Sequence, residues 1–268
     1  MREREEQGLP RAVICDIDGT LLQEQQKIPS QRILRCLAAV REKGILLIIA
    51  TGRIRQLIPS ALVELADYCV CGNGGLVVDH AGKILRETPF DADLVEGLAA
   101  FSDKIGAALS FSFPSGYGVY RDFPTISRLY LGCAEGELPL TDESATRTRH
   151  RTEPPFSAFL IGNEGRVYSY LRRQHRLQGA RQWQDHFDIY PVATTKAAGI
   201  SGILQERSIK WKEVVAFGDS PNDLEMLAAA GRGYAMGNAC PEAKQLARFE
   251  APPVWEDGVA QVLEEILR

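Results

Sequence analysis

The sequence contains no long apolar run and no strong excess of charge of either sign. Its longest uninterrupted apolar stretch is Ile45–Ala50, whereas a membrane-spanning helix needs about 20 such residues. Residues 1–7 are mostly charged and lack the apolar segment of a secretory signal. A net charge of -4 gives no electrostatic reason to expect nucleic acid or an acidic membrane as a partner. We therefore expect a cytoplasmic protein that acts without either.

Cysteine and histidine are scarce, and neither is spaced like metal ligands. Of the six cysteines, only Cys69 and Cys71 lie close together, at a spacing unlike that of the usual zinc pairs. The four histidines follow no ligand spacing either. Cys15, Cys36 and Cys69 fall in apolar patterns, where buried free thiols are expected. The chain also has no internal repeat and no low-complexity tract, and its reduced thiols favour the cytoplasm.

Short apolar segments separated by helical patterns dominate both ends of the chain. Nearly continuous apolar strands are typical of parallel sheets that are covered on both faces, and their alternation with helices predicts right-handed crossovers. We therefore predict an α/β, Rossmann-like parallel-sheet core domain over residues 1–86 and 190–268. Its predicted strands are Ala12–Asp16, Ile45–Ala50, Tyr68–Cys71, Val214–Phe217 and Tyr234–Met236.

The pattern changes over residues 87–189, which we predict to be an inserted α+β domain with an antiparallel sheet. Leu109, Phe111 and Phe113 alternate with small polar residues, which predicts a half-buried strand. Residues 135–155 are polar and predict a loop or an irregular helix. Helices are also predicted from Asp91 or Asp93 to Lys104 and over Asn163–Leu177, and strands over Tyr117–Arg121, Ser127–Leu131, Ser157–Ile161 and Arg181–Tyr190.

Four clusters of polar residues occur where apolar strands end. In open α/β sheets, ligands bind at the carboxyl ends of the strands, so these clusters are expected to face one crevice. Several carboxylates in one place are costly without a cation, and hard oxygen ligands suit Mg²⁺. A lysine, a hydroxyl and backbone N–H groups beside a metal form a site for a phosphoryl group. The clusters are Asp16 with Asp18, Thr51-Gly52, Lys196, and Asp219 with Asn222 and Asp223.

The pair Asp16 and Asp18 is ambiguous when it is considered alone. Side chains two positions apart on a strand project to the same side, and like charges so close raise one pKa unless a cation separates them. Bound metal, separate acid and nucleophile roles, and a plain strand-to-turn junction are all compatible with the pair. Four other candidates also have simpler interpretations. Thr51 also fits a helix cap, and Lys196 a surface lysine. Asp223 also fits a carboxylate favoured by the helix dipole, and Arg53 a bridge across the surface.

The ordered set of motifs resembles the haloacid dehalogenase superfamily of phosphatases, and within it the Cof-like group with a type IIB cap. Only 35 positions separate Asp16 from Thr51, whereas 145 separate Thr51 from Lys196. The resemblance therefore implies that the inserted domain is a cap between the second and third motifs. The matching segments are Asp16–Leu22, Ile49–Arg53, Gly72–Gly75, Lys196, Gly218–Asp223, Met236–Ala239 and Glu256–Val259.

The resemblance implies a role for each matching residue. Asp16 is expected to be the nucleophile that attacks phosphorus, and Asp18 the acid that protonates the leaving group and then activates water. Mg²⁺ is expected to be held by Asp16, the backbone carbonyl of Asp18, and Asp219. The expected phosphate-binding residues are Thr51, Gly52, Lys196 and Asn222, with Asp223, Arg53 and Asn73 in supporting positions.

Two of the matching segments depart from the family's pattern. Ala197-Ala198 follow Lys196 where glycine is usual, and Gly72 stands where glutamate or asparagine is usual. We predict a Mg²⁺-dependent phosphatase that hydrolyses a small phosphorylated metabolite, such as a sugar phosphate or a phosphorylated cofactor, through an aspartyl-phosphate. A phosphomutase or phosphotransferase with the same chemistry is the first alternative, because acceptor choice depends on how the cap excludes water. A non-catalytic module that binds phosphometabolites is the second.

Overall fold

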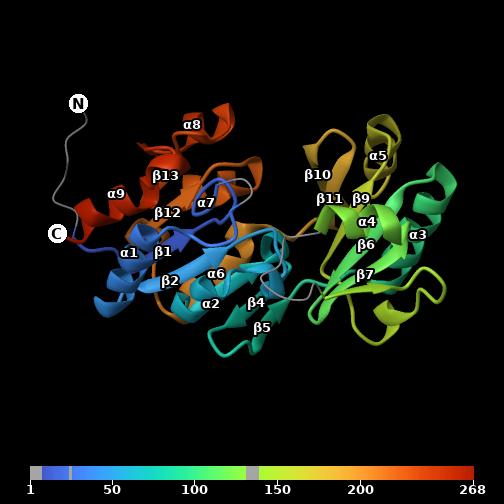
Figure 1. Ribbon diagram of the computed structural model, residues 1–268, viewed down its shortest axis with the longest axis horizontal. Helices are drawn as coiled ribbons and strands as arrows, with labels where there is room; N and C mark the ends of the chain where they lie inside the picture. Colours follow the sequence, from blue (N-terminus) through green and yellow to red (C-terminus); the bar gives the residue numbers. More distant parts are fainter. Residues whose placement is uncertain (1–7, 24–25, 131–138) are drawn as a thin grey trace.

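The computed structural model describes residues 8–23, 26–130 and 139–268, and it contains two β-sheets, each with its own helices (Figure 1). The first sheet has eight strands in the order β14-β13-β12-β1-β2-β3-β4-β5. The six strands from β14 to β3 are parallel, and β4 and β5 add an antiparallel hairpin at one edge. The strands are β1 (Ala12–Cys15), β2 (Leu46–Ala50), β3 (Tyr68–Cys71), β4 (Leu76–Asp79), β5 (Ile84–Glu87), β12 (Val214–Gly218), β13 (Arg232–Met236) and β14 (Phe249–Ala251).

Helices cover both faces of the first sheet, which explains why its central strands are continuously apolar. Every residue of β1, β3 and β12 is buried. One helical layer consists of α1 packed against α2 and α9, and the other of α7 packed against α6 and α8. These helices are α1 (Gln31–Glu42), α2 (Ser60–Leu65), α6 (Lys196–Glu206), α7 (Leu224–Ala229), α8 (Pro241–Leu246) and α9 (Gly258–Ile266). The predicted α/β fold with a parallel-sheet core is confirmed.

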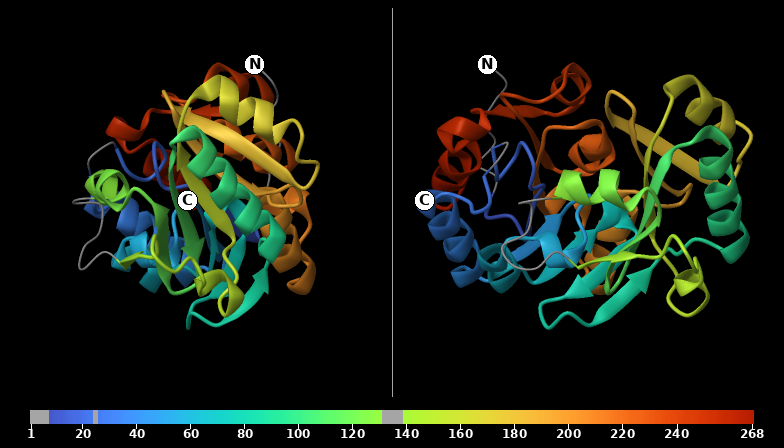
Figure 2. Two further views of the ribbon diagram at one scale, coloured as in Figure 1. Left: turned by 90° about the vertical axis from the view of Figure 1, so that its right-hand side faces the viewer. Right: turned by 45° about the vertical axis from the view of Figure 1, so that its right-hand side comes forward.

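The second sheet is mostly antiparallel and has the order β10-β11-β9-β6-β7-β8, in which only β7 and β8 run parallel. Helices α3 and α5 pack on one face of this sheet, and α4 lies on the face turned toward the first sheet (Figure 2, right). The elements are β6 (Ala108–Phe113), β7 (Gly116–Arg121), β8 (Leu140–Asp142), β9 (Ser157–Ile161), β10 (Leu177–Trp183), β11 (His186–Pro191), α3 (Ala92–Ile105), α4 (Phe123–Tyr130) and α5 (Glu164–Leu171). The exact domain boundaries, 86/87 and 189/190, remain a prediction.

Strand β6 is buried on both faces, so the predicted half-buried strand is wrong. Leu109, Phe111 and Phe113 belong to the apolar core beneath α3 and α5. Ser110 and Ser112 lie on the opposite face and are 0% and 5% exposed. Helix α4 contacts β6 from that side. The alternation of residue types distinguished the two faces, but it could not show that a helix covers the polar one.

The segment predicted as a strand over Ser127–Leu131 is helical as far as Tyr130, and Leu131 lies outside the described residues. Asp122 caps the amino-terminal end of helix α4, since its carboxylate accepts a hydrogen bond from the Thr125 N–H at 3.3 Å. Ile126 and Tyr130 are four positions apart and both face the apolar cluster formed with β6. The helical spacing of the apolar residues therefore matches the observed structure, although their residue types also suit a strand.

One predicted helix is shorter than expected, one predicted strand is divided between two strands, and two strands were not predicted. The helix predicted over Asn163–Leu177 ends at Leu171, and the strand predicted over Arg181–Tyr190 is part of the hairpin β10–β11. The chain turns at Gln184, which has a φ of +39°. Strands β8 and β14 have only three residues each, too few to produce a periodic signal. Residues 135–138 of the predicted irregular segment lie outside the described residues.

Within the described ranges, no helix combines the length and apolarity that a bilayer-spanning segment requires. The described cysteines, Cys15, Cys36, Cys69, Cys71 and Cys240, are all free thiols.

Candidate active site

The carboxyl ends of β1, β2 and β12 bring the predicted site residues together. Strand β1 lies between β2 and β12, with Cys15 opposite Ile49 on one side and Phe217 on the other. Asp16 continues the strand, because its N–H donates to the Phe217 carbonyl at 3.1 Å. Asp219 follows β12, and Thr51 follows β2, so the two residues lie on either side of the end of β1. The parallel arrangement therefore converts three distant strand ends into one cluster.

A buried lysine joins two of the carboxylates. The Lys196 ammonium donates to Asp16 Oδ1 at 2.6 Å and to Asp223 Oδ1 at 2.7 Å. Lys196 and Asp223 are at most 1% exposed and Asp16 is 5% exposed, so the interpretation of Lys196 as a surface lysine is wrong. Helix α6 begins at Lys196, where the Thr195 hydroxyl accepts from the Ala198 N–H. The alanines that follow Lys196 are thus accommodated by an ordinary cap.

Burial and crowding shift the pKa values of this cluster. Burial raises the pKa of Asp16 well above its usual range, Lys196 lowers it, and the Asp223 and Asp219 carboxylates raise it further. Burial, followed by the neighbouring Asp223, raises the pKa of Asp219 to about 6. Burial lowers the pKa of Lys196, but Asp16 and Asp223 more than offset this and hold it above its ordinary value. Lys196 is therefore a charged ammonium ion, and its single positive charge is outnumbered by the three carboxylates of the cluster.

The donor set fits a divalent cation. Carboxylate oxygens of Asp16, Asp219 and Asp223 all lie within 4.8 Å of one another. Asp223 already has fixed partners, since its Oδ2 accepts from the backbone N–H groups of Asp219 and Ser220 at 3.0 Å each. Asp16 and Asp219 therefore offer the oxygen atoms best suited to a metal, and a hard cation would relieve the repulsion that raises their pKa values.

Gly19 makes room for the Asp219 carboxylate. Its φ is +82°, and a Cβ atom there would lie 2.3 Å from Asp219 Oδ2. The turn is also held by Asn238, whose side-chain amide donates to the Gly19 carbonyl at 2.8 Å. Gly19 therefore has both a conformational and a steric reason to be glycine.

We expect Gly19→Ala to weaken divalent-metal binding at least about tenfold, because a displacement of Asp219 costs at least one charge-assisted ligand contact. The left-handed backbone should also reduce the free energy of unfolding by about 1–2 kcal/mol. Isothermal titration and urea unfolding measure the two effects. Gly44→Ala is a matched control, since Gly44 has a φ of +72° but no atom within 4 Å of its added Cβ. Equal metal affinity in the two variants would contradict the steric role of Gly19.

Asp18 lies apart from this cluster and pairs with Arg53. The guanidinium donates to both Asp18 carboxylate oxygens, at 2.9 and 2.6 Å, and Arg53 is itself held by the Leu57 carbonyl at 2.8 Å. The Asp18 side chain is 61% exposed, in contrast to buried Asp16. The two aspartates of the motif thus occupy different environments, and Asp18 is not among the clustered carboxylates.

The remaining predicted residues surround this centre. The Thr51 hydroxyl accepts from the Arg53 N–H at 3.1 Å, as in a cap, and is fully buried. Asn73 adopts a left-handed conformation with a φ of 55° beside Gly52, and its side-chain oxygen accepts from the Asn222 amide at 2.8 Å. The Asn222 side-chain oxygen is buried without a hydrogen-bond partner among the described residues.

The unusual Gly72 has a packing explanation. Its φ is +53°, and a Cβ atom would lie 2.3 Å from Cε2 of the Phe156 ring. Phe156 immediately precedes β9 of the second sheet but packs in the apolar core of the first. A larger residue at position 72 would displace this contact between the two sheets.

A pocket of about 350 Å³ opens between the two sheets above these residues. Its floor includes Asp16, Asp18, Gly52, Arg53 and Asn222. Its roof comes from the second sheet and α4, namely Tyr117, Leu129, Tyr130, Phe159 and Asp188. The roof residues could not be predicted from the sequence, because no motif marks them and they converge only through folding.

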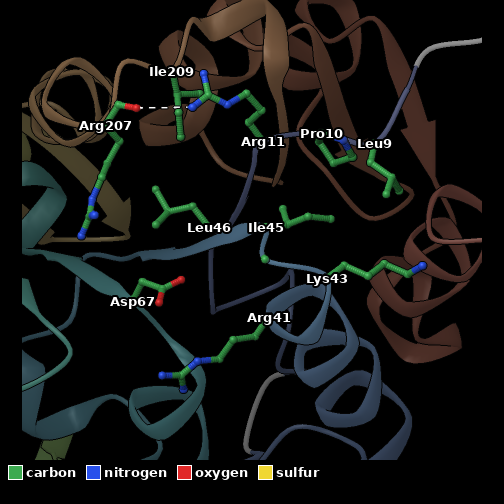
Figure 3. Close-up of a pocket in the computed structure, with 11 residues that line it drawn as sticks. Leu9, Pro10, Arg11, Arg41, Lys43, Ile45, Leu46, Asp67, Arg207 and Ile209 are labelled. Atoms are coloured by element: carbon green, nitrogen blue, oxygen red, sulfur yellow. Dashed lines mark hydrogen bonds between the residues drawn. The ribbon is translucent and has the colours of Figure 1, made fainter.

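A second cavity, of about 570 Å³, lies at the opposite, amino-terminal ends of β1 and β2 (Figure 3). Three arginines line it, but each bonds to the protein itself: Arg11 to the Ser208 carbonyl, Arg41 to the Glu64 carbonyl and Arg207 to the Tyr68 hydroxyl. The side chains of Arg41 and Lys43 point in opposite directions (Figure 3). The cavity is larger than the first pocket, but the three arginines among its described lining residues are already bonded to the protein.

Comparison with known protein families identifies the class of hydrolase that has this fold and this carboxylate cluster. A family model described as haloacid dehalogenase-like hydrolase matches residues 13–263. The chain belongs to this family of hydrolases, as the motifs predicted.

Particular relatives cover nearly all of the chain. It is 29% identical to a Streptococcus pyogenes protein named as a bifunctional phosphatase/peptidyl-prolyl cis-trans isomerase, over 96% of this chain and 54% of that protein, so it spans about half of that protein's length. It is 28% identical to an HMP-PP phosphatase of Yersinia pseudotuberculosis, over 88% and 86% of the two chains. The solved structure of a subclass IIB sugar phosphatase has the same fold, with a TM-score of 0.82, 24% identity and coverage of 95% and 98%.

Proposed function

We propose that the protein is a Mg²⁺-dependent phosphomonoesterase that hydrolyses a small phosphorylated metabolite through an aspartyl-phosphate on Asp16. The main support is the buried Asp16, bonded to Lys196 beside Asp219 and Asp223, on the floor of a pocket that a second carboxylate, Asp18, also lines. Asp16, the Asp18 backbone carbonyl and Asp219 would hold Mg²⁺. When bound, the cation supplies positive charge that neutralises the carboxylates and the phosphoryl oxygens.

The reaction then proceeds in two displacements. A carboxylate oxygen of Asp16 attacks phosphorus, the bond to the leaving oxygen breaks, and Asp18 gives that oxygen a proton. Asp18 next takes a proton from water, which attacks the aspartyl-phosphate and releases inorganic phosphate and the Asp16 carboxylate. Asp18 and Asp16 thereby return to their starting protonation states.

Four groups are proposed to hold the phosphoryl oxygens. The Lys196 ammonium is charged and directed at Asp16, and Gly52 contributes backbone N–H. The Thr51 hydroxyl accepts from the Arg53 N–H, which leaves its own proton available to donate. Asn73 fixes the orientation of Asn222 by accepting from its amide. Asp223 holds Lys196 in position through its 2.7 Å contact.

Arg53 is proposed to position Asp18. Its planar guanidinium binds both carboxylate oxygens, a geometry that restrains side-chain rotation. Asp18 must release one of these oxygens and take up a proton from solvent before it can protonate the leaving group, so substrate binding is expected to rearrange this pair.

Residues 87–189 are proposed to act as a cap over the core of residues 1–86 and 190–268. The cap encloses a pocket whose 350 Å³ volume suits a metabolite rather than a polymer. An HMP-PP phosphatase and a sugar phosphatase among the similar proteins support this size class. The free thiols of the described cysteines are compatible with the cytoplasm that we propose as its location.

Release of inorganic phosphate tests the proposal. The purified protein with Mg²⁺ should release phosphate from a generic aryl phosphate, and EDTA should stop the release. Isomerised product without free phosphate from a sugar phosphate would instead identify a phosphomutase. Binding of phosphate esters without any turnover would identify a non-catalytic module.

Mg²⁺ is expected to stabilise the fold at pH 7.5, by about 2.7 kcal/mol at a concentration 100 times its dissociation constant. Because the pKa of Asp219 is raised to about 6, this carboxylate takes up a proton as the pH falls through that value. The stabilisation should therefore shrink between pH 7.5 and 5. Thermal unfolding with and without Mg²⁺ measures it. Asp219→Asn should remove the effect, whereas Asp185→Asn, in the exposed β10–β11 turn, should preserve it.

A further inference from the structure

A groove of about 620 Å³ lies between helices α3 and α5, on the face of the second sheet that is turned away from the first sheet (Figure 1). Helix α4, which contributes to the active-site pocket, lies on the opposite face of the second sheet. The groove is therefore separate from the active site. Its volume is within the range of pockets that bind small molecules, about 300–1,000 Å³.

Part of the groove lining is aromatic and apolar. Phe101 of α3 and Tyr170 of α5 stack with their ring centroids 4.1 Å apart and an interplanar angle of 13°. Ile105 lies about one helical turn beyond Phe101 and lines the same groove. These three side chains are half-buried, so their outer surfaces remain accessible. A planar ring of a ligand would gain offset or edge-on contacts with the stacked pair, which are more favourable than the buried area alone.

Three cations also line the groove, and no carboxylate is among its described lining residues: Lys104, Arg166 and Arg173. Lys104 lies three positions after Phe101 on α3, and Arg166 lies four positions before Tyr170 on α5. These two cations are therefore on the same helical faces as the stacked rings. Within the described part of the chain, the three cationic side chains have neither a hydrogen bond nor an ion pair.

The carboxylates that lie next to these cations in the sequence bind other arginines. Asp103 pairs with Arg121 at 2.9 Å and with Arg147 at 2.6 Å. Glu164, in the first turn of α5, pairs with Arg181 at 2.7 Å. The positive charges of the groove are consequently left without a counter-charge, although other arginines of the same domain have one.

We propose that the groove between α3 and α5 is a second ligand-binding site, for a small anion that joins a planar ring to phosphate groups, as a nucleoside diphosphate does. The ring packs against Phe101 and Tyr170. The phosphate oxygens accept charge-assisted hydrogen bonds from Lys104, Arg166 and Arg173. The cations and the rings come from two helices and converge on one groove of small-molecule size, which favours such a ligand over an extended acidic surface.

Isothermal titration of the full chain in EDTA with ADP, adenosine and pyrophosphate tests the inference. ADP should bind at least about tenfold more tightly than either of the other two, because only ADP combines the ring with the phosphate groups. Absence of ADP binding, or equal affinity for adenosine or pyrophosphate, would overturn the inference. Because EDTA removes divalent cations, the titration does not depend on turnover. Phosphate release without ADP binding would contradict only this inference, and ADP binding without phosphate release only the proposed function.

Substitution of the two arginines locates the binding. The double variant Arg166→Gln, Arg173→Gln should bind ADP at least about tenfold more weakly, because two charge-assisted hydrogen bonds are lost. Both positions are exposed, so the fold should be retained, which thermal unfolding verifies. Arg172→Gln is the matched control, since Arg172 is exposed but does not line the groove. Unchanged ADP affinity in the double variant would place the binding elsewhere and overturn the inference.

Tyr170→Leu tests the contribution of the rings. It keeps an apolar side chain but removes one member of the stacked pair, so ADP affinity should fall about threefold or more. Pyrophosphate affinity should stay the same, because the cations are untouched. Unchanged ADP affinity, or an equal loss for both ligands, would overturn the assignment of a ring-bearing ligand.

Discussion

Asp16→Asn is expected to abolish turnover of p-nitrophenyl phosphate in Mg²⁺, with a loss of about 10⁴-fold or more, as for other catalytic nucleophiles. The amide is nearly isosteric but cannot form the aspartyl-phosphate. The substitution also removes the negative charge that faces Lys196 at 2.6 Å. Initial rates of p-nitrophenol release measure the loss, and circular dichroism establishes that the variant is folded. Activity close to that of the unmodified protein would rule out Asp16 as the nucleophile.

Asp18→Asn is the informative control for this experiment. Its side chain is 61% exposed and lies outside the carboxylate cluster, so metal binding should remain largely intact. Turnover should still fall by about 10²–10⁴-fold, the usual contribution of a general acid or base. Asp219→Asn should instead impair metal binding directly. If Asp18→Asn weakened metal binding as strongly as Asp219→Asn, the proposed division of roles between Asp16 and Asp18 would be wrong.

Lys196→Met is expected to reduce both stability and activity. It leaves Asp16 and Asp223 buried without their common cation, and removal of one partner from a buried ion pair typically costs about 3–5 kcal/mol. Turnover should also fall, because the phosphoryl group loses its ammonium partner. Urea unfolding in EDTA measures the stability, and Lys212→Met, at an exposed position, is the matched control.

The pH dependence of Lys196→Met provides a second test. Without Lys196, which lowers the pKa of Asp16, that pKa should rise further above its value in the unfolded chain. An acid with a raised folded-state pKa destabilises the fold where it is ionised, so the penalty is full at pH 8 and shrinks as the pH falls through the folded-state pKa. The variant should therefore approach the stability of the unmodified protein toward pH 5. A penalty independent of pH would indicate lost packing rather than unpaired charge.

Features based on local patterns were predicted well. Apolar runs that end in Asp16, Thr51 and Asp219 identified parallel strands and their functional ends, because strand composition reports burial on both faces. Predictions failed where a distant element decides the outcome. Helix α4 buries the polar face of β6, and the turn at Gln184 divides a segment that seemed continuous.

The sequence by itself therefore determined the α/β class and the family. It also placed Asp16, Asp219 and Asp223 at strand ends expected to face one crevice, but it did not separate Asp18 from them. Only the tertiary structure decided that Arg53 holds Asp18, that Phe156 requires a glycine at position 72, and that an aromatic roof with Asp188 covers the pocket. The physical reason is the range of the interactions. Strand and helix patterns arise within about ten residues, whereas Lys196 reaches Asp16 across 180 positions. Such contacts depend on how whole elements pack, and no local pattern encodes them.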